Sequence, residues 1–267
     1  MYFCFGILNR ILSGGIPDDL YCFFAFELGL KLLIVTSNFK HSFHMSDSAA
    51  VIFDMDGVLV HSNPAHKKAI QIFCERHGRE VSEAFMEKRL FGRTNKEWIP
   101  ELFGKLDADE LQRLADEKER LFRDLFDPEE NVVEGIRHFL QELGNRGIPT
   151  AVATSAPREN ADYILSRLSI EDYFEVVLDS SHVNRGKPDP EVYLKASDIL
   201  RRVPAACIVF EDSVSGVEAA RRAGTRVVGV TTTHSEEELS PCSLLIDNFV
   251  DLQVERLLNL PANPQNQ

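Results

Sequence analysis

The stretch Ala49–Val60, which reads AAVIFDMDGVLV, decides the fold. Its first five residues are apolar and lead directly into the carboxylate of Asp54. Apolar runs without polar alternation are typical of parallel strands covered on both faces, so a buried strand ending at Asp54 is predicted. Because ligand sites in open α/β sheets lie beyond the carboxyl ends of the strands, Asp54 and Asp56 are expected in such a site. Gly57 then allows a sharp turn and a close approach of the backbone to a ligand.

The sequence Asp-x-Asp-Gly also occurs as a plain strand followed by a turn, because Asp and Gly are common turn residues. Three later stretches decide between the two interpretations. The first is Thr150–Pro157 (TAVATSAP), where an apolar run ends at the hydroxyl of Thr154, followed by Ser155. A hydroxyl and free amides at a helix start can hold phosphate oxygens. A Ser or Thr helix cap gives the same pattern, and the two interpretations are compatible.

The other two stretches supply a cation and further acids. In Asn184–Pro190 (NRGKPDP), Lys187 lies in a loop stiffened by two prolines, which fixes an ammonium group better than a helix surface does. In Val209–Gly216 (VFEDSVSG), an apolar strand ends in Glu211 and Asp212. Carboxylate-rich oxygen ligation with room for water is what Mg²⁺ prefers. The stretches together therefore predict a magnesium site at the carboxyl edge of a parallel sheet.

Composition excludes several classes of function. The chain has 267 residues and a formal net charge of −13, so it lacks the basic surplus that a nucleic-acid partner requires. Its 5 cysteines include no C-x-x-C pair, which argues against a disulfide framework and a zinc cluster. Cys74 and Cys207 lie in apolar contexts and are expected to be core residues in a reducing, cytoplasmic compartment. A small anionic substrate is compatible with this charge when a cation offsets the repulsion.

Residues 1–46 differ in pattern from the rest of the chain. The apolar segment Leu20–Thr36 contains Glu27 and Lys31 and is barely long enough to cross a bilayer. Our leading expectation is that Met45 is the initiator and that the first 44 residues are upstream sequence or a disordered, loosely packed extension; residues 1–46 as a whole are assigned outside the fold. The alternative is a membrane or targeting anchor.

After Val60 the pattern changes from strand to helix. Pro64 at a first-turn position opens one helical stretch, and three more follow at Ser82–Leu90, Asn95–Phe103 and Ala108–Phe126. Residues 62–129 are therefore predicted to form a helical cap domain that acts as a lid over the site. The glycine-containing loop Phe91–Thr94 could reach down over that site.

From Val132 onward, strands and helices alternate, which predicts a doubly wound parallel α/β sheet with Rossmann-like topology. Residues 47–61 and 130–260 are assigned to this core domain, and residues 261–267 to a disordered tail. The predicted strands are Thr150–Thr154, Phe174–Asp179, Cys207–Glu211, Arg226–Val230 and Leu244–Asp247. The predicted helices are Val133–Gly144, Arg158–Leu168, Pro190–Leu200, Gly216–Ala223 and Asp251–Leu258.

With four motifs in this order, the sequence from Ala50 to Val250 resembles the haloacid dehalogenase superfamily of phosphatases and phosphomutases. The resemblance implies that Asp54 is the nucleophile that forms an aspartyl-phosphate. It implies that Asp56 is the general acid and base. Thr154 and Ser155 would hold phosphoryl oxygens, and Lys187 would neutralise developing charge.

The resemblance also implies a metal site and further substrate contacts. Asp212, Asp54 and the carbonyl of Asp56 would hold Mg²⁺, with Glu211 assisting directly or through water. Met55 and Gly57, which flank Asp56, would lie against the substrate. The dehalogenase branch itself is disfavoured, because Asp56 and the acidic pair Glu211 and Asp212 suit phosphoryl chemistry with a metal.

Within the superfamily, the chain looks most like the branch of β-phosphoglucomutase and sugar-phosphate phosphatases. His66 falls where the mutase has a cap-hinge histidine that contacts the general acid, although many phosphatases of the branch also have one. Phe91 and Asn95 stand where the mutase has basic residues for a second phosphate, and Arg93 and Lys118 could replace them. Because a mutase grips two phosphates in turn, the missing basic residues favour a phosphatase.

Three functions are therefore weighed. The first is a Mg²⁺-dependent phosphatase acting on a small phosphorylated metabolite such as a sugar phosphate. The second is a sugar phosphomutase, and the third is a non-catalytic binding module on the same fold. The expected partner is the small metabolite, with no nucleic acid and no membrane, and a monomer is the default oligomeric state.

Overall fold

The computed structural model describes residues 48–90 and 93–261. The predictions made for residues 1–46, for the loop residues Phe91 and Gly92, and for the tail from 262 onward lie outside the described residues. Within the described ranges, no helix has both the length and the apolar composition needed to cross a bilayer.

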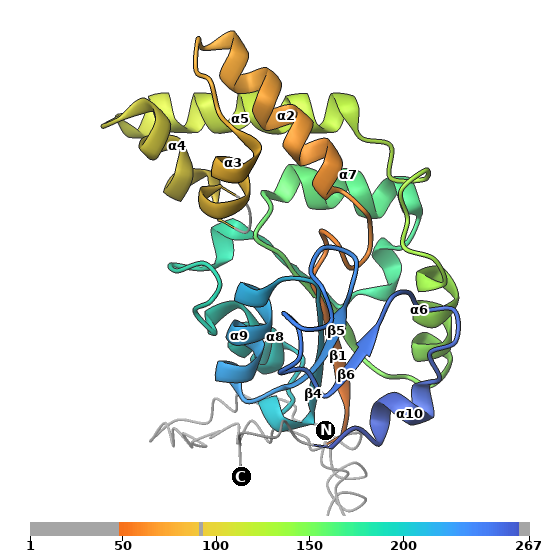
Figure 1. The fold of residues 1–267 in the computed structure, drawn as a ribbon. Coiled ribbons are helices and arrows are strands. Elements are labelled where there is room, and N and C mark those ends of the chain that lie inside the picture. The colour runs from red at the N-terminus through yellow and green to blue at the C-terminus, as the bar shows by residue number, and fades with distance from the viewer. Residues whose placement is uncertain (1–47, 91–92, 262–267) are drawn as a thin grey trace, which may run out of the picture. The chain divides into compact units, whose positions relative to one another are not determined.

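The described strands form one parallel sheet in the order β3-β2-β1-β4-β5-β6, as predicted for a doubly wound α/β fold (Figure 1). This order places β1 between β2 and β4, so the three strands that carry the predicted site residues are neighbours. Their bounds are β1 Ala50–Phe53, β2 Thr150–Ala153, β3 Val176–Leu178, β4 Cys207–Glu211, β5 Arg226–Val230 and β6 Leu244–Ile246.

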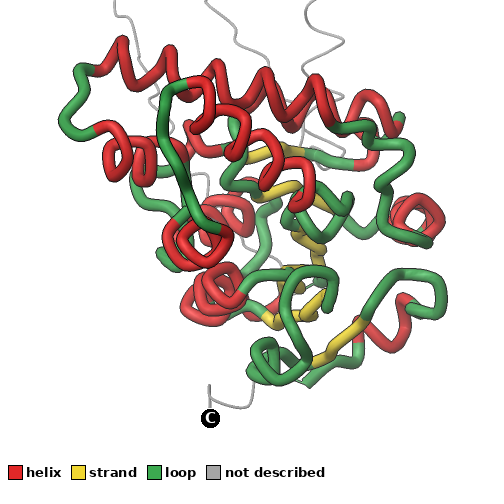
Figure 2. The backbone as a smooth tube through the Cα atoms, turned by 45° about the horizontal axis from the view of Figure 1, so that its top comes forward, coloured by secondary structure: helices red, strands yellow, loops and turns green. Residues whose placement is uncertain are grey.

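Alternate residues of each central strand face two separate apolar cores. In β1, Val51 and Phe53 belong to one core, and Ala50 and Ile52 belong to the other. Helices cover both faces of the sheet, as Figure 2 shows. The first core is covered by α6 (Ile136–Asn145), α7 (Arg158–Leu168) and α10 (Val254–Leu258), and the second by α8 (Glu191–Ile199) and α9 (Val214–Ala223). The continuous apolar run of β1 thus has its expected cause, burial on both faces.

In the described part of the chain, five helices lie between β1 and β2; the first four, α2 to α5, form the insertion, and α2 packs along α5 (Figure 1). The local sequence explains where these helices begin. Ser82 accepts a hydrogen bond from the amide of Phe85, and Asp107 accepts one from the amide of Glu110, so both act as N-caps. The inserted helices are α2 Asn63–Arg76, α3 Glu83–Arg89, α4 Asn95–Phe103 and α5 Ala108–Leu125.

The predicted element boundaries needed correction where tertiary contacts compete with helix formation. Helix α6 begins at Ile136, three residues after the predicted start, because Gly135 adopts φ +83° and Val133 donates its amide to the carbonyl of Leu59. Helix α9 begins two residues earlier than predicted, because Ser213 caps it by accepting from the amide of Gly216. Helix α10 is also shorter than predicted and begins at Val254.

Candidate active site

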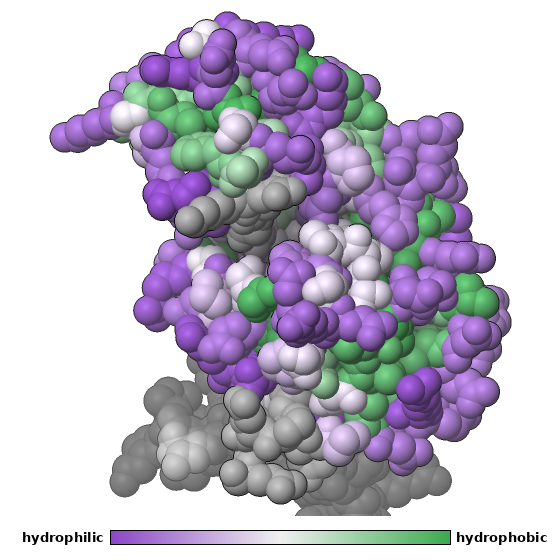
Figure 3. Space-filling model, in the orientation of Figure 1, coloured by the Kyte–Doolittle hydropathy of each residue, from purple (hydrophilic) through white to green (hydrophobic). Residues whose placement is uncertain are grey.

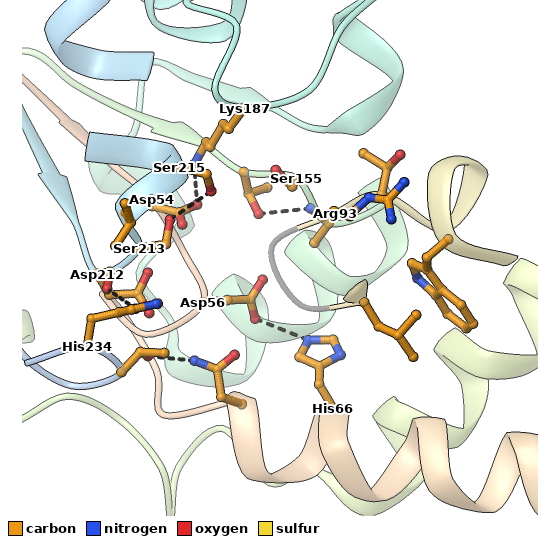
Figure 4. Close-up of a pocket in the computed structure, with 18 of the residues that line it drawn as sticks. Asp54, Asp56, His66, Arg93, Ser155, Lys187, Asp212, Ser213, Ser215 and His234 are labelled. Atoms are coloured by element: carbon orange, nitrogen blue, oxygen red, sulfur yellow. Dashed lines mark hydrogen bonds and ion pairs between the residues drawn. The ribbon is translucent and has the colours of Figure 1, made fainter. Parts of the chain in front are cut away.

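The ends of β2, β1 and β4 bring the predicted polar side chains to one edge of the sheet (Figure 4). Asp54 follows β1 and donates its backbone amide to the carbonyl of Phe210 at 3.0 Å. Thr154 follows β2 and donates its backbone amide to the carbonyl of Leu178 at 2.9 Å. Asp212 follows β4, and all three side chains are buried. The prediction that these three strand ends meet is confirmed.

A cavity of about 930 Å³ lies between this edge and the inserted helices. Figure 3 shows the surface hollowed on this side of the molecule. The lining of this cavity includes every predicted site residue apart from Met55, Gly57 and Glu211. Met55 has a fully buried side chain, so only its backbone can contribute to binding, and its amide donates to the Asp54 carboxylate.

Lys187 reaches from the loop after β3 and joins two of the acids. Its ammonium lies 3.0 Å from Oδ1 of Asp54 and 2.7 Å from Oε1 of Glu211, and it donates to the carbonyl of Ala153 at 3.1 Å. Burial opposes the charge of Lys187, but the two carboxylates outweigh it and raise the pKa of this lysine. Lys187 is therefore a permanent cation beside Asp54.

Glu211 accepts hydrogen bonds from several donors through both of its carboxylate oxygens. It accepts hydrogen bonds from Lys187, from the hydroxyl of Tyr193 at 2.7 Å, and from the amides of Asp212 and Ser213 at 3.0 Å. Burial opposes ionisation, yet these partners keep the pKa of Glu211 below its ordinary value. Because both oxygens are occupied, Glu211 is better placed to fix Lys187 and the chain turn than to bind a ligand directly.

Two glycines leave the space that these acids occupy. Gly57 has φ +77°, and a Cβ built on it would lie 1.9 Å from Oδ2 of Asp212. Gly216, in the first turn of α9, would place a Cβ 1.7 Å from Oε1 of Glu211. Gly57, which was predicted from the sequence to allow close approach of the backbone to a ligand, therefore accommodates a carboxylate, and so does Gly216.

Gly57→Ala should displace Asp212 and strain the turn. We expect the free energy of unfolding to fall by about 1–3 kcal/mol, the usual cost of a non-glycine residue in a strained conformation. We also expect weaker binding of a divalent cation, because Asp212 can no longer occupy its position. Chemical denaturation and isothermal titration with Mg²⁺ measure the two effects. Gly147→Ala is the control, because Gly147 also has a positive φ, of 63°, but a Cβ added there would meet nothing within 4 Å. Equal cation affinity in both variants would contradict this account.

The charge and the oxygen chemistry of this acidic cluster fit a hard divalent cation. Oxygens of Asp54, Glu211 and Asp212 all lie within 4.8 Å of one another. Burial, followed by the charges of its acidic neighbours, raises the pKa of Asp54 to about 7 even though Lys187 opposes the rise. The same causes raise the pKa of Asp212 well above its ordinary value. When ionised, the three acids and Lys187 leave two negative charges in excess, which one Mg²⁺ would neutralise.

Asp56 faces the inserted helices instead of this acidic cluster. Its Oδ1 accepts hydrogen bonds from the hydroxyl of Ser62 and from Nε2 of His66, the latter at 3.4 Å. Burial opposes ionisation, but these donors lower the pKa of Asp56. Because both donors reach the same oxygen, Oδ2 is the oxygen that can exchange a proton with a ligand.

The tautomer of His66 follows from its other neighbour. Lys118 lies 3.0 Å from Nδ1 of His66, and an ammonium can only donate, so Nδ1 accepts and Nε2 carries the hydrogen. The imidazole also stacks on Phe122 at 3.8 Å between ring centroids. His66 is thus fixed as a donor toward Asp56.

Lys118 is itself paired with a buried acid. It donates to Oε1 of Glu119 at 2.9 Å, and Glu119 also accepts from Asn95 and Asn160 at 2.7 Å each. Although burial disfavours the charge, Lys118 and the other partners lower the pKa of Glu119 to about 2. Glu119 is a carboxylate throughout the physiological pH range.

Glu119 should make stability depend on pH in the acid range. A depressed pKa in the folded state stabilises the protein above the unfolded value near 4.5, and that contribution is lost as pH falls toward 2. The shift corresponds to about 3 kcal/mol. We therefore expect Glu119→Gln to be less stable than wild type at pH 7, and the difference in the free energy of unfolding to shrink between pH 4.5 and pH 2. Denaturant titrations at several pH values measure it, and a constant difference would refute the assignment.

The two basic side chains of the insertion that could hold a second phosphate are both paired with carboxylates. Arg93 donates to Oε1 of Glu101 at 2.6 Å, while Lys118 contacts Glu119 and His66. Both side chains line the cavity, a point that the sequence left open. Lys118 is neutralised by Glu119, whereas Arg93 shares Glu101 with Arg89, so these two arginines have one carboxylate between them.

Several residues of the site were not predicted. Ser62 is the N-cap residue of α2, and Tyr193 lies in α8. Glu119, Asn160 and His234 were also missed; Asn160 lies on α7, and Nδ1 of His234 is 3.0 Å from the carbonyl of Asp212. Ser62 directly precedes the helix, but its hydroxyl donates to Asp56 and makes no capping hydrogen bond. The other contacts join segments far apart in the sequence and leave no local pattern.

The fold and the site define an α/β protein with a buried acidic centre at the carboxyl edge of its sheet and a helical insertion above it. A family model described as haloacid dehalogenase-like hydrolase matches residues 49–224. The chain belongs to this family, and the resemblance inferred from its four motifs is confirmed.

Relatives and solved structures agree on the branch. The phosphorylated carbohydrates phosphatase of Thermotoga maritima is 41% identical over 187 residues, 68% of this chain and 84% of the relative. Beta-phosphoglucomutase of Bacillus subtilis is 34% identical over 216 residues, 78% of this chain and 93% of the relative. The crystal structure of a HAD hydrolase, family IA, variant 3, from Entamoeba histolytica matches with a TM-score of 0.72 at 30% identity, covering 79% of this chain and 98% of that chain.

Proposed function

We propose that the protein is a Mg²⁺-dependent phosphatase that hydrolyses a small phosphorylated metabolite, with a sugar phosphate as the favoured substrate class. The observation that carries this proposal is the pairing of Asp54 with Lys187 at 3.0 Å, beside Asp212 and opposite Thr154 in one cavity. Such an arrangement provides a nucleophile, a fixed positive charge and donors for phosphoryl oxygens, which is what phosphoryl transfer requires. The similarity to a phosphatase of phosphorylated carbohydrates supports the substrate class.

In the first step, a carboxylate oxygen of Asp54 attacks phosphorus, and the bond from phosphorus to the leaving oxygen breaks. The electron pair stays on that oxygen, which takes a proton from Oδ2 of Asp56. Asp56 is ionised in the free protein because its pKa is lowered. A phosphoryl dianion bound beside it raises its proton affinity, since like charges disfavour the ionised form. In the second step, water attacks the phosphorus of the aspartyl-phosphate and gives a proton to Asp56. The bond between phosphorus and the Asp54 oxygen breaks, so phosphate is released and Asp54 is restored.

Asp54 and Asp212 would hold Mg²⁺, which supplies positive charge to the phosphoryl oxygens when bound. The carbonyl of Asp56 would complete the set that the protein provides. Glu211 would fix Lys187 and the turn into α9 without direct ligation, since its oxygens already accept from four residues. Thr154 and Ser155 would donate to phosphoryl oxygens.

A sugar phosphomutase is the alternative, supported by the 34% identity with beta-phosphoglucomutase. A mutase must hold a second phosphate against the inserted helices. Arg93 and Lys118, which could serve there, are already paired with Glu101 and Glu119, and Glu101 also pairs with Arg89. A second phosphate would have to compete with these carboxylates, so release of phosphate is favoured over its return to the substrate.

Phosphate release from a panel of phosphorylated metabolites tests the proposal. We expect turnover with Mg²⁺ and a loss of more than about a hundredfold after chelation, because a bound cation contributes several kcal/mol to this chemistry. Restoring Mg²⁺ should restore the activity. Conversion of a sugar 1-phosphate to the 6-phosphate with a bisphosphate primer, without net release of phosphate, would instead establish the mutase. Full activity in the chelator would overturn the metal assignment.

A further inference from the structure

We propose that Glu119 and Asn160 are positioning residues, which link helix α7 of the core to helix α5 of the insertion and thereby orient Asp56 through Lys118 and His66. This inference rests on the proposed function, in which Asp56 transfers the proton. The contacts join residues from three helices and the loop after β1 into one continuous polar chain that ends at the reacting carboxylate.

The contact between the two helices is buried and fully specified. Glu119 is 5% exposed and Asn160 is fully buried. The amide nitrogen of Asn160 donates to Oε2 of Glu119 at 2.7 Å, while its carbonyl oxygen accepts from Arg123 at 2.6 Å. Glu119 and Arg123 lie one turn apart on α5, so both ends of the Asn160 amide are held by the same helix face. A polar bridge this deep fixes α5 against α7 in one register, because an unpaired buried charge is costly.

The second oxygen of Glu119 connects the bridge between α5 and α7 to the site through Lys118. Oε1 of Glu119 accepts from Lys118, and Lys118 donates to Nδ1 of His66. Lys118 is 4% exposed, so it has no bulk water to replace a lost partner. Without the carboxylate of Glu119, the ammonium would lose its counter-charge and leave Nδ1 of His66. The imidazole could then adopt the other tautomer, with no hydrogen on Nε2 to donate to Asp56.

A simple structural role for Glu119 makes a different prediction. If the bridge only held the helices together, its loss would lower the activity toward every substrate by the same factor. If it orients the proton donor, the loss depends on how much the leaving group needs a proton. A sugar alkoxide needs one, whereas nitrophenolate leaves as a stable anion. The ratio of kcat/KM for the two substrates therefore separates the roles, since kcat/KM reports the steps up to departure of the leaving group.

The experiment compares Glu119→Gln, Asn160→Ala and the matched control Glu117→Gln with wild type. Glu117 lies on the same helix and also contacts a histidine, His77 at 3.1 Å, but that contact is outside the cavity lining. For Glu119→Gln, we expect kcat/KM to fall by about 10- to 100-fold on a sugar phosphate, a part of the usual effect of general acid catalysis. On 4-nitrophenyl phosphate we expect less than about a threefold loss. Asn160→Ala should change the ratio in the same direction, and Glu117→Gln should change neither value.

Equal losses on both substrates, or none on either, would overturn the inference. Nitrogen NMR of His66 gives a second readout that needs no turnover. We expect the Nε2-protonated tautomer in wild type and in Glu117→Gln, and its loss in Glu119→Gln. An unchanged tautomer would also overturn the inference. If wild type hydrolyses no phosphate monoester, the proposed function fails, whereas the NMR result still decides whether Glu119 fixes His66.

Discussion

Replacing Asp54 by Asn is expected to lower kcat by about 10⁴-fold or more, the scale seen when a catalytic nucleophile is removed. The amide has nearly the same shape as the carboxylate but cannot form the aspartyl-phosphate. Burial already raises the pKa of Asp54 to about 7, so a neutral side chain suits this position. We therefore expect the free energy of unfolding at pH 7 to stay near the wild-type value. Steady-state phosphate release and denaturant unfolding measure the two quantities.

Asp162→Asn is the control for this substitution. It makes the same chemical change on α7, where Asp162 forms an exposed pair with Arg158 at 2.7 Å. Exposed pairs contribute little, so both activity and stability should remain. If Asp54→Asn kept more than about a tenth of the wild-type kcat, the activation free energy would have risen by less than about 1.4 kcal/mol, and Asp54 could not be the nucleophile.

Lys187→Met is expected to abolish activity and to destabilise the protein by about 3–5 kcal/mol, the cost of removing one partner from a buried ion pair. The ammonium contacts both Asp54 and Glu211, and its own side chain is 5% exposed. Methionine would leave two buried carboxylates side by side without a cation. Chemical denaturation measures the loss, and it should be larger at pH 7 than at acid pH, where these carboxylates take up protons.

The double variant Lys187→Met with Asp54→Asn sharpens the test. It removes one of the two unpaired carboxylates, so we expect it to be more stable than Lys187→Met alone. Lys195→Met is the control, because Lys195 forms a surface pair with Glu191 at 2.7 Å that should contribute less than about 1 kcal/mol. Equal costs for Lys187→Met and Lys195→Met would mean that the buried network does not stabilise the fold.

The sequence predicted the fold well because its strongest signals are local. The apolar run before Asp54 indicates a strand buried on both faces, and β1 shows that burial residue by residue. The glycine after Asp56 was expected to permit close approach, and Gly57 does so by leaving room for Asp212. Alternation of apolar runs with helical periodicity then predicted a parallel sheet without any knowledge of strand order.

Boundaries and partners were harder to predict, since they depend on contacts between distant segments. Helix α6 starts late because Val133 pairs with Leu59, a residue more than 70 positions earlier. The acid of Glu119 looks like any other in the charged helix Ala108–Leu125, yet it is buried against Asn160. The sequence also could not show that Arg93 is paired with Glu101, which weakens the case for a second phosphate site.

The same limit applies to Glu211. Its place beside Asp212 suggested that it assists the metal directly or through water. The structure places it in the acidic cluster with Asp54 and Asp212, and also surrounds it with donors from Lys187, Tyr193 and the backbone after β4. Adjacent acids at a strand end can thus divide their tasks, because successive side chains point to opposite faces. Only the packing around each acid shows which one is free to bind a ligand.

The central claim is that Asp54 accepts the phosphoryl group, and trapping that intermediate tests it most directly. The wild-type enzyme is mixed with substrate and Mg²⁺, the reaction is stopped with acid during turnover, and the peptides are analysed by mass spectrometry. The account predicts one phosphoryl group on the peptide that contains Asp54, located on that residue and absent from Asp54→Asn. A phosphoryl group on His66, Ser155 or another residue instead of Asp54 would contradict it.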